Sequence, residues 1–166
     1  MTLSHLDEAG RARMVDVGGK PVTTRHATAT GRVLMSVAAM EQVEHATARK
    51  GDVLTVAEVA GIMAAKRTGD LIPLCHPVPL DRVEVRIVPV PEWPGVRVTA
   101  TARATARTGV EMEALVAVTV ACLTVYDMVK AVDRGARIEA VRVTEKAGGA
   151  RGTWRADADD DPNEGV

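Results

Sequence analysis

The feature that most constrains the fold is an uncharged apolar run over residues 114–126, which Glu113 precedes and Asp127 follows. A membrane-spanning helix needs about 20 apolar residues, and this run is shorter. Its unbroken length favours a helix over a strand, so we predict a helix over residues 110–134 with Gly135 as its cap. Because the helix is apolar almost all round, we expect it in the core or at a contact between subunits.

The remaining core has to be aliphatic, because the 166-residue chain contains two Trp, one Tyr and no Phe. Strands without aromatic side chains lack the stacking surfaces of RNA-recognition modules and other nucleic-acid-binding domains. The formal net charge is -1, from 21 basic and 22 acidic residues. That balance predicts no basic surface for nucleic acid or for an anionic membrane.

Length and cysteine usage indicate a single cytoplasmic domain. A domain has about 100–200 residues and at this size needs no disulfide or metal for stability. We expect one catalytic domain over residues 1–156, opening with an irregular segment over 1–22, and a disordered acidic tail over 157–166. The polar start of the chain lacks the pattern of a secretory signal. Both thiols, Cys75 and Cys122, are therefore expected to be reduced.

Periodicity predicts an α+β fold. Strands are predicted over residues 23–37, 83–87, 96–102 and 138–143, and helices over 38–48, 53–67 and 110–134. The order is that of a ferredoxin-like fold, with an antiparallel four-stranded sheet and helices packed on one face. The second helix has two candidate N-terminal caps, Asp52 and the capping box Thr55–Glu58, and Gly61 within it indicates a close packing contact.

Charged residues at the ends of the long helix are the first candidates for chemistry. Asp127 and Lys130 are three residues apart and share one helix face. Glu113 lies about 40° away on the same side, and Glu111 points nearly the opposite way. An ion pair of this kind is usually exposed and weak. Here apolar neighbours predict partial burial, which shifts the pKa of a carboxylate and suits it to proton transfer.

The stiff loop over residues 71–79 is the second candidate, because its three prolines exclude a helix or a central strand. It presents Cys75-His76, either as a packed loop histidine or as a group offered to a ligand. A Cys-His dipeptide lacks the ligand spacing of a metal site. No cation lies near Cys75 in sequence to activate it as a nucleophile.

Basic residues at element ends form the third set. They are Arg25, Lys50, Lys66, Lys130 and Lys146. Each alone is typical of a solvated surface, but together they can line a phosphate site. No Walker-type or dinucleotide glycine pattern is present, and Gly148-Gly149 beside Lys146 is only a weak indication of a phosphate loop.

Long motifs cover about residues 4–154 and contain rare combinations. They are His5-Leu-Asp7, Met14-Val-Asp-Val17 with Lys20, Lys50-Gly-Asp-Val-Leu54, Ala60-Gly-Ile-Met-Ala-Ala-Lys66, Asp70-Leu-Ile-Pro-Leu-Cys-His-Pro77, Thr108-Gly-Val-Glu-Met-Glu-Ala-Leu115, Leu123-Thr-Val-Tyr-Asp-Met128 with Lys130-Ala131, and Lys146 with Gly148-Gly149. Read together, they resemble the molybdenum cofactor biosynthesis protein C family, the cyclic pyranopterin monophosphate synthases. Gly18-Gly19, Val116 and Ala150-Arg151 depart from the family pattern.

The resemblance implies a reaction and its residues. The family is a phosphorus-oxygen lyase that converts 3′,8-cyclo-7,8-dihydroguanosine 5′-triphosphate to cyclic pyranopterin monophosphate and pyrophosphate. It implies Asp127 and Lys130 as catalytic residues. The implied substrate-binding residues are Leu74, Cys75, His76, Met112, Glu113, Lys50, Arg25 and Lys146. It also implies a ferredoxin-like homohexamer, a trimer of dimers, with each site built from two subunits.

The chemistry of that reaction agrees with the residues. Ring rearrangement and loss of pyrophosphate need acids, bases and cations, and they need no redox cofactor. No metal site is expected in the protein, and it stays open whether Mg²⁺ accompanies the triphosphate. The alternative is an inactive paralogue that binds a small molecule as a regulator. A regulator has no need of a proton-transfer pair, so Asp127 and Lys130 favour the enzyme.

Overall fold

The computed structural model describes residues 5–7, 9–45, 52–90, 92–150 and 152–157, and the predicted acidic tail lies outside these ranges except for Asp157. The strands are β1 (Thr23–Leu34), β2 (Arg82–Pro89), β3 (Gly95–Ala106), β4 (Arg137–Ala147) and β5 (Trp154–Arg155). The helices are α1 (Val37–Glu44), α2 (Val53–Ala65), α3 (Thr68–Leu71) and α4 (Glu111–Val129).

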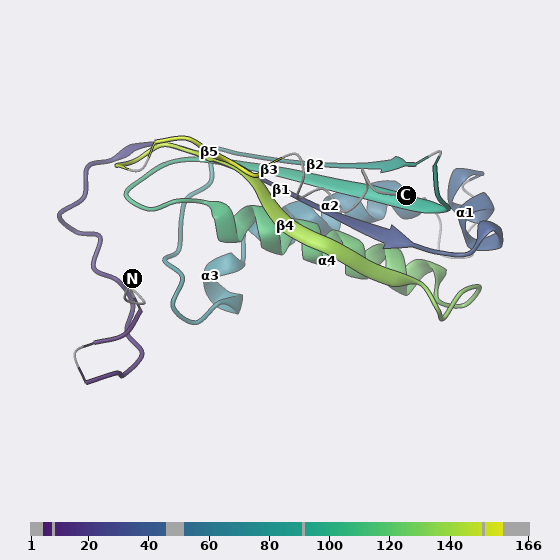
Figure 1. Cartoon of the computed structure of the whole chain (residues 1–166), viewed down its shortest axis with the longest axis horizontal. Helices are drawn as coiled ribbons and strands as arrows, with labels where there is room; N and C mark the ends of the chain where they lie inside the picture. The colour runs from purple at the N-terminus through teal and green to yellow at the C-terminus, as the bar shows by residue number, and fades with distance from the viewer. Residues whose placement is uncertain (1–4, 8, 46–51, 91, 151, 158–166) are drawn as a thin grey trace.

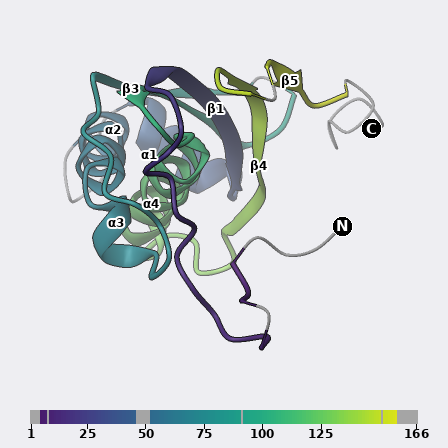
Figure 2. The same ribbon diagram turned by 90° about the vertical axis from the view of Figure 1, so that its left-hand side faces the viewer.

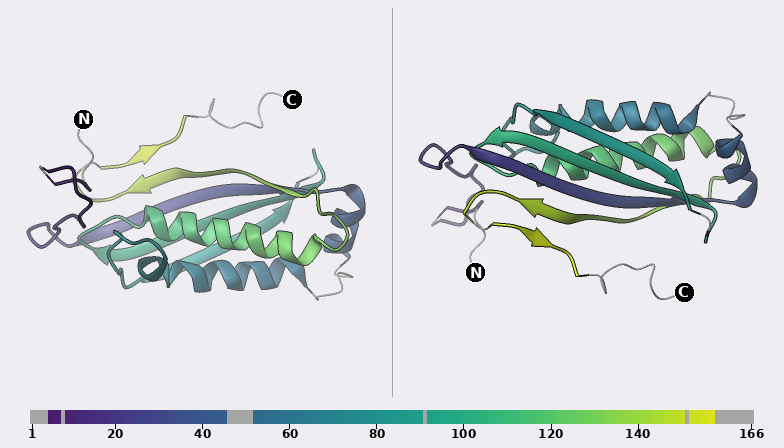
Figure 3. Two further views of the ribbon diagram at one scale, coloured as in Figure 1. Left: turned by 90° about the horizontal axis from the view of Figure 1, so that it is seen from below. Right: turned by 90° about the horizontal axis from the view of Figure 1, so that it is seen from above.

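The strands form one antiparallel sheet in the order β2-β3-β1-β4-β5, so the first strand of the chain is central. Helices α2 and α4 lie side by side on one face of this sheet, and the other face carries no helix within the described residues (Figures 1, 2 and 3). The predicted ferredoxin-like α+β class is confirmed. The sheet has five strands rather than four, because the two residues of β5 pair with Glu145 and Lys146 of β4.

Several element ends differ from the sequence prediction. The long helix ends at Val129 instead of residue 134, with Lys130 as its C-terminal cap. The last strand extends to Ala147, and its ragged pattern has a cause in Ala140, which has a φ of 52° next to a register shift against β1. Helix α3 was not predicted.

The N-terminal cap of α2 is Asp52, whose Oδ1 accepts from the Thr55 backbone N–H at 3.1 Å. The alternative capping box is wrong, because the Glu58 carboxylate leaves the helix and accepts from the Ile87 N–H at 3.0 Å. Glu58 therefore ties α2 to the edge strand β2. By accepting this bond, Asp52 satisfies a backbone N–H in the first turn of α2 that has no partner within the helix.

Small residues let the two layers approach closely. A Cβ on Gly61 of α2 would lie 2.9 Å from the Ala117 carbonyl oxygen, and one on Gly31 of β1 would lie 2.7 Å from Val118. The contact predicted for Gly61 is confirmed. Helix α4 is long and apolar enough to cross a membrane, but most of it is buried against the sheet and α2, as expected for a core helix.

The outer faces of the two helices remain apolar in places. Val59 and Met63 of α2 and Leu123 of α4 are exposed, each by about half of its surface. Both helices belong to the layer that covers one face of the sheet (Figure 3).

Candidate active site

A cavity of about 810 Å³ lies where α4 begins, between the start of β1 and the end of β4. The lining residues are His5, Val15, Val17, Lys20, Arg25, His26, residues 72–76, residues 107–109, Glu111, Met112, residues 146–148 and Ala150. The fold therefore gathers six of the residues that the sequence suggested for the site: Arg25, Leu74, Cys75, His76, Met112 and Lys146.

Cations dominate the charge of this cavity. Lys20, Arg25, Arg107 and Lys146 line it together with the carboxylate of Glu111, and Lys146 Nζ donates to Glu111 Oε1 at 2.7 Å. Burial tends to raise the pKa of Glu111. The hydrogen bond from Lys146 and the nearby cations outweigh burial, and the pKa lies below its usual value. A wall with an excess of positive charge suits a polyanionic ligand.

Arg25 is held in this wall by the backbone around it. Its Nε donates to the Ala106 carbonyl and its Nη2 to the Arg107 carbonyl, each at 3.3 Å. A Cβ on Gly149 would collide with the Arg25 guanidinium, and Gly149 also has a φ of 75°. Both the available space and the left-handed backbone require glycine here. The glycine turn thus packs on a cation of the cavity.

The loop after α3 supplies Leu74, Cys75 and His76 to the wall. Before this loop, the buried Thr68 ties the start of α3 to the end of α2, because its Oγ1 donates to the Ala65 carbonyl at 2.9 Å. Burial, followed by the charges of the two glutamates at the start of α4, raises the pKa of the Cys75 thiol. A thiol with a raised pKa stays protonated near neutral pH and is a poor nucleophile.

Glu113 faces a different space from its neighbour Met112. It lines a separate cavity of about 320 Å³ together with Lys66 and Asp70. Its side chain is 2% exposed, and Oε2 has no hydrogen-bond partner within the described residues. Burial, reinforced by the charge of Glu111, raises the pKa of Glu113. Such a carboxyl group can carry a proton at a pH where an ordinary glutamate is ionised.

Asp127 and Lys130 lie at the other end of α4. Lys130 Nζ donates to Asp127 Oδ1 at 2.5 Å, and this contact raises the pKa of Lys130. Both side chains are 52% exposed, so the predicted partial burial is wrong for the single chain. The apolar neighbours that motivated that prediction, Met128 and Val129, point into the core instead.

The predicted site is therefore split within one chain. Glu111 and Asp127 are sixteen residues apart on α4, which corresponds to about 24 Å at the helical rise. Helical periodicity predicts Glu113 and Asp127 on the same side of α4. Their surroundings differ, however, because Glu113 is buried and Asp127 is exposed. Lys50 lies outside the described residues.

The sequence reasoning missed Glu111, Lys20 and Arg107 as cavity residues, and it missed Glu111 because helical periodicity directed it away from the other candidates. Two signals could have found it. Gly109 stands two residues earlier, where a Cβ would collide with the Glu111 carboxylate. Lys146, already a candidate, needed an acidic partner, and Glu111 at the start of the core helix is that partner.

Comparison with known proteins gives a consistent result. The model of the MoaC family matches residues 14–149. A protein named cyclic pyranopterin monophosphate synthase from Methylobacterium sp. (strain 4-46) is 56% identical over 94% of this chain and 98% of its own length. The protein of that name from Thermomicrobium roseum is 56% identical over 95% of this chain and 95% of its own length. The protein of that name from Novosphingobium aromaticivorans is 57% identical over 93% of this chain and 97% of its own. With its ferredoxin-like sheet and a match over most of its length, the chain belongs to the MoaC family.

Proposed function

We propose that this chain is a cytoplasmic cyclic pyranopterin monophosphate synthase, a phosphorus-oxygen lyase. Its substrate is 3′,8-cyclo-7,8-dihydroguanosine 5′-triphosphate, and its products are cyclic pyranopterin monophosphate and pyrophosphate. The observation that carries this proposal is the cationic cavity, which brings together six residues predicted to bind the substrate. The names of the relatives support the same activity.

The charge of the cavity fits the triphosphate. In this proposal Arg25 and Lys146 neutralise the phosphates and stabilise the pyrophosphate as it leaves. His76 and Met112 contact the base or the sugar from the loop and from the start of α4. Lys50 acts with the phosphate-binding cations, from outside the described residues. The reaction needs no redox cofactor, and any Mg²⁺ enters with the triphosphate.

Proton transfer falls to carboxyl and amine groups on α4. Asp127 and Lys130 move protons at the ring carbons and the ribose oxygens, and Glu113 contributes to substrate binding from the separate cavity beside the start of α4. Groups of this type contribute about 10²–10⁴-fold to a rate when they are positioned at the reacting atoms. The raised pKa of Glu113 lets this residue hold a proton where a normal glutamate would not.

The distance along α4 requires a second subunit in this proposal. Asp127 and Lys130 of one chain complete the cavity of another, within a homohexamer that is a trimer of dimers. The exposure of the Asp127–Lys130 pair supports this arrangement, because a proton-transfer pair works best when it is shielded from water. Exposed Met63 and Leu123 give the helical layer an apolar surface for such a contact.

The direct test is turnover of the cyclised triphosphate by purified protein, followed by pyrophosphate release. Wild type should form pyrophosphate and a pterin product, and Asp127→Asn and Lys130→Ala should not. Binding without turnover by the wild type would instead identify an inactive paralogue. Near-full turnover by both folded variants would show that the assigned pair is wrong.

Subunit mixing tests the shared site. Asp127→Asn and Lys146→Ala damage different ends of α4, so at substrate concentrations well below KM each alone should be nearly inactive. After dissociation and reassembly of the mixture, about a quarter of the sites would combine two undamaged halves and activity should return to that level. A mixture as inactive as its components would refute a site built from two subunits.

A further inference from the structure

Trp154 is the only Phe, Tyr or Trp in the described strands, and it lies beside a cation of the cavity. In the short edge strand β5 it pairs directly with Lys146 of β4. Directly paired residues of an antiparallel sheet place their side chains on the same face, with Cβ atoms about 4.5–5.5 Å apart. Lys146 lines the cavity and reaches Glu111 of α4, so its face is the helical one. Trp154 therefore lies on the side of the sheet that carries the cavity.

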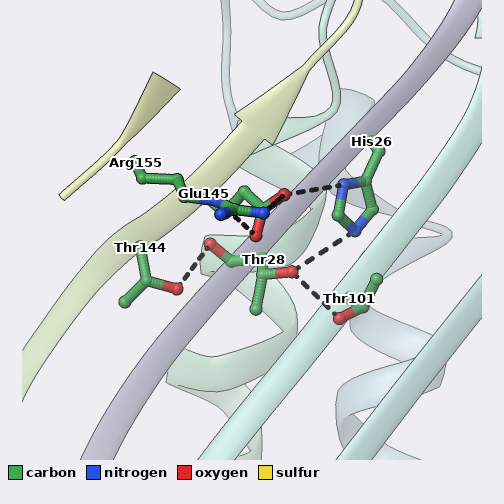
Figure 4. Close-up of polar contacts among 6 residues, drawn as sticks. All are labelled: His26, Thr28, Thr101, Thr144, Glu145 and Arg155. Atoms are coloured by element: carbon green, nitrogen blue, oxygen red, sulfur yellow. Dashed lines mark hydrogen bonds and ion pairs between the residues drawn. The ribbon is translucent and has the colours of Figure 1, made fainter. Parts of the chain in front are cut away.

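The neighbouring pair of these two strands supports this assignment of faces. Glu145 precedes Lys146 and pairs with Arg155, which follows Trp154. Arg155 Nε lies 3.4 Å from Glu145 Oε2, and Figure 4 shows this ion pair on the face of the sheet opposite to the helix. Because successive side chains of a strand alternate between its faces, Lys146 and Trp154 share the helical face.

A row of residues across the sheet shows where Trp154 lies relative to the core. The strand register places Ala102 of β3, Ala27 of β1, Lys146 and Trp154 side by side in that order. Both alanines are completely buried, Lys146 lines the cavity, and Trp154 is 46% exposed. Trp154 itself is not among the lining residues. The row thus runs from the core through the cavity wall to an indole at the rim of the cavity.

The other two aromatic side chains of the protein have structural contacts. The ring of Trp93 lies 5.7 Å from the guanidinium carbon of Arg32, and Tyr126 packs against the hydrophobic core. Within the described part of the chain, Trp154 belongs neither to the core nor to the residues packed against it. An indole combines a large apolar face with a polar edge, which suits it to contact with a ligand. In a chain with so few aromatic residues, its place at the rim of a cavity indicates such a contact.

We propose that Trp154 is a specificity-determining residue, whose indole stacks on the ring of the guanosine-derived base while the cations beside it hold the triphosphate. The identity of the substrate comes from the proposed function, on which this inference rests. Arg25 and Lys146 attract phosphate whatever is attached to it. Stacking on an aromatic side chain distinguishes a ligand with a flat ring from an anion that has none. The cavity thereby selects a nucleotide over inorganic polyphosphate.

Indole fluorescence tests the stacking directly and needs no turnover. Trp93→Phe leaves Trp154 as the single tryptophan, because the chain contains two. On rapid mixing, the cyclised triphosphate should quench this emission severalfold at saturation. Tripolyphosphate, which brings the charge without a ring, should hardly change it. Equal quenching by the two ligands would show that the indole responds to phosphate alone and would overturn the inference.

Steady-state kinetics provide the second readout. Trp154→Ala should raise KM for the cyclised triphosphate about tenfold with kcat within about twofold, as expected for the loss of a stacking contact that serves binding. Trp154→Phe, which keeps an aromatic ring, should retain most of the affinity. Val37→Ala removes another exposed apolar side chain, at the start of α1, and as the control should leave KM unchanged.

The outcomes separate this inference from the proposed function. An unchanged KM in Trp154→Ala, or equal losses in Trp154→Ala and Trp154→Phe, would overturn the inference. A change of oligomer size in Trp154→Ala, measured by sedimentation, would also overturn it, because the indole would then belong to a contact between subunits. Quenching without turnover by the wild type would refute the proposed function alone. Turnover without quenching would refute the inference alone, and the absence of both would refute both.

Discussion

The two ends of α4 carry similar ion pairs in different surroundings. At the first end, Glu111 and Lys146 meet at 2.7 Å with side chains 30% and 32% exposed. At the last end, Asp127 and Lys130 meet at 2.5 Å with both side chains 52% exposed. The first pair joins two elements across a cavity, whereas the second lies within three residues of one helix. Within one chain, only the first end of α4 lines the large cavity.

The difference shows what one chain can and cannot build. A single core helix places acidic groups at both of its ends, but the sheet and the loop after α3 cover only the first. An ion pair left in water is screened by solvent, and water competes for its hydrogen bonds. In the proposed oligomer, a second subunit would cover this open end.

The largest effect is expected at the exposed end. Asp127→Asn should lower kcat about 10³-fold through loss of acid–base catalysis. Thermal unfolding should hardly change, since the exposed pair adds little to stability. Glu84→Gln, which removes the exposed partner of Arg82, is the control and should keep full turnover. A large loss of melting temperature in Asp127→Asn would mean that the pair is structural.

At the covered end, the effect should be on binding. Lys146→Ala removes a charge-assisted contact to the phosphates, of the kind worth about 1.5–3 kcal/mol, so KM should rise about 10–100-fold. Arg97→Ala removes an exposed cation of β3 outside the cavity and should leave KM unchanged. Equal KM values for the two variants in steady-state assays would remove Lys146 from the phosphate site.

Much of this arrangement could be predicted from the sequence. The apolar run over residues 114–126 led to the core helix, and the order of strands and helices led to the fold class. Asp52 and Gly61 signalled a cap and a close contact, and both are present. These features depend on local periodicity and local turn chemistry, which a sequence states directly.

The features that could not be predicted depend on contacts between distant segments. Whether Glu113 or Asp127 is buried follows from what packs over each end of α4, which helical periodicity does not reveal. Glu111 enters the cavity because Lys146, thirty-five residues later, reaches it. The two residues of β5 carry too little pattern to indicate a strand, and they pair only because β4 extends beside them.

Stability should respond to pH in opposite directions at Glu113 and Glu111. The folded-state pKa of Glu113 is raised, so the folded protein binds more protons there, and stability falls as pH rises from the unfolded pKa to the folded one. Glu113→Gln should therefore stabilise the protein at pH 8, by an amount on the order of 1 kcal/mol, and should gain less at pH 4. Urea unfolding of the wild type and the variant at pH 8 and pH 4 measures the change in the free energy of unfolding.

Glu111 provides the matched comparison. Its folded pKa is lowered, so its contribution to stability is present above the unfolded pKa and is lost as pH falls through the folded one. Glu111→Gln should then destabilise the protein at pH 8 and matter less at pH 4. Changes of the same sign in the two variants would contradict the opposite environments assigned to these neighbouring residues.

The smallest effect is expected in the reactivity of the two thiols, of which one lies in the cavity wall and the other in the core. Burial raises the pKa of Cys75 in the wall, and it raises the pKa of Cys122 on the buried side of α4 to about 12. At pH 7.5 iodoacetamide should therefore modify Cys75 severalfold more slowly than a free cysteine and leave Cys122 untouched in the native protein. Tripolyphosphate should slow the reaction of Cys75 further, because that thiol lines the cavity, whereas unfolding in urea should expose both thiols equally. Rapid labelling of Cys75 that tripolyphosphate does not slow would show that this wall of the cavity is open to solvent and not occupied by phosphate.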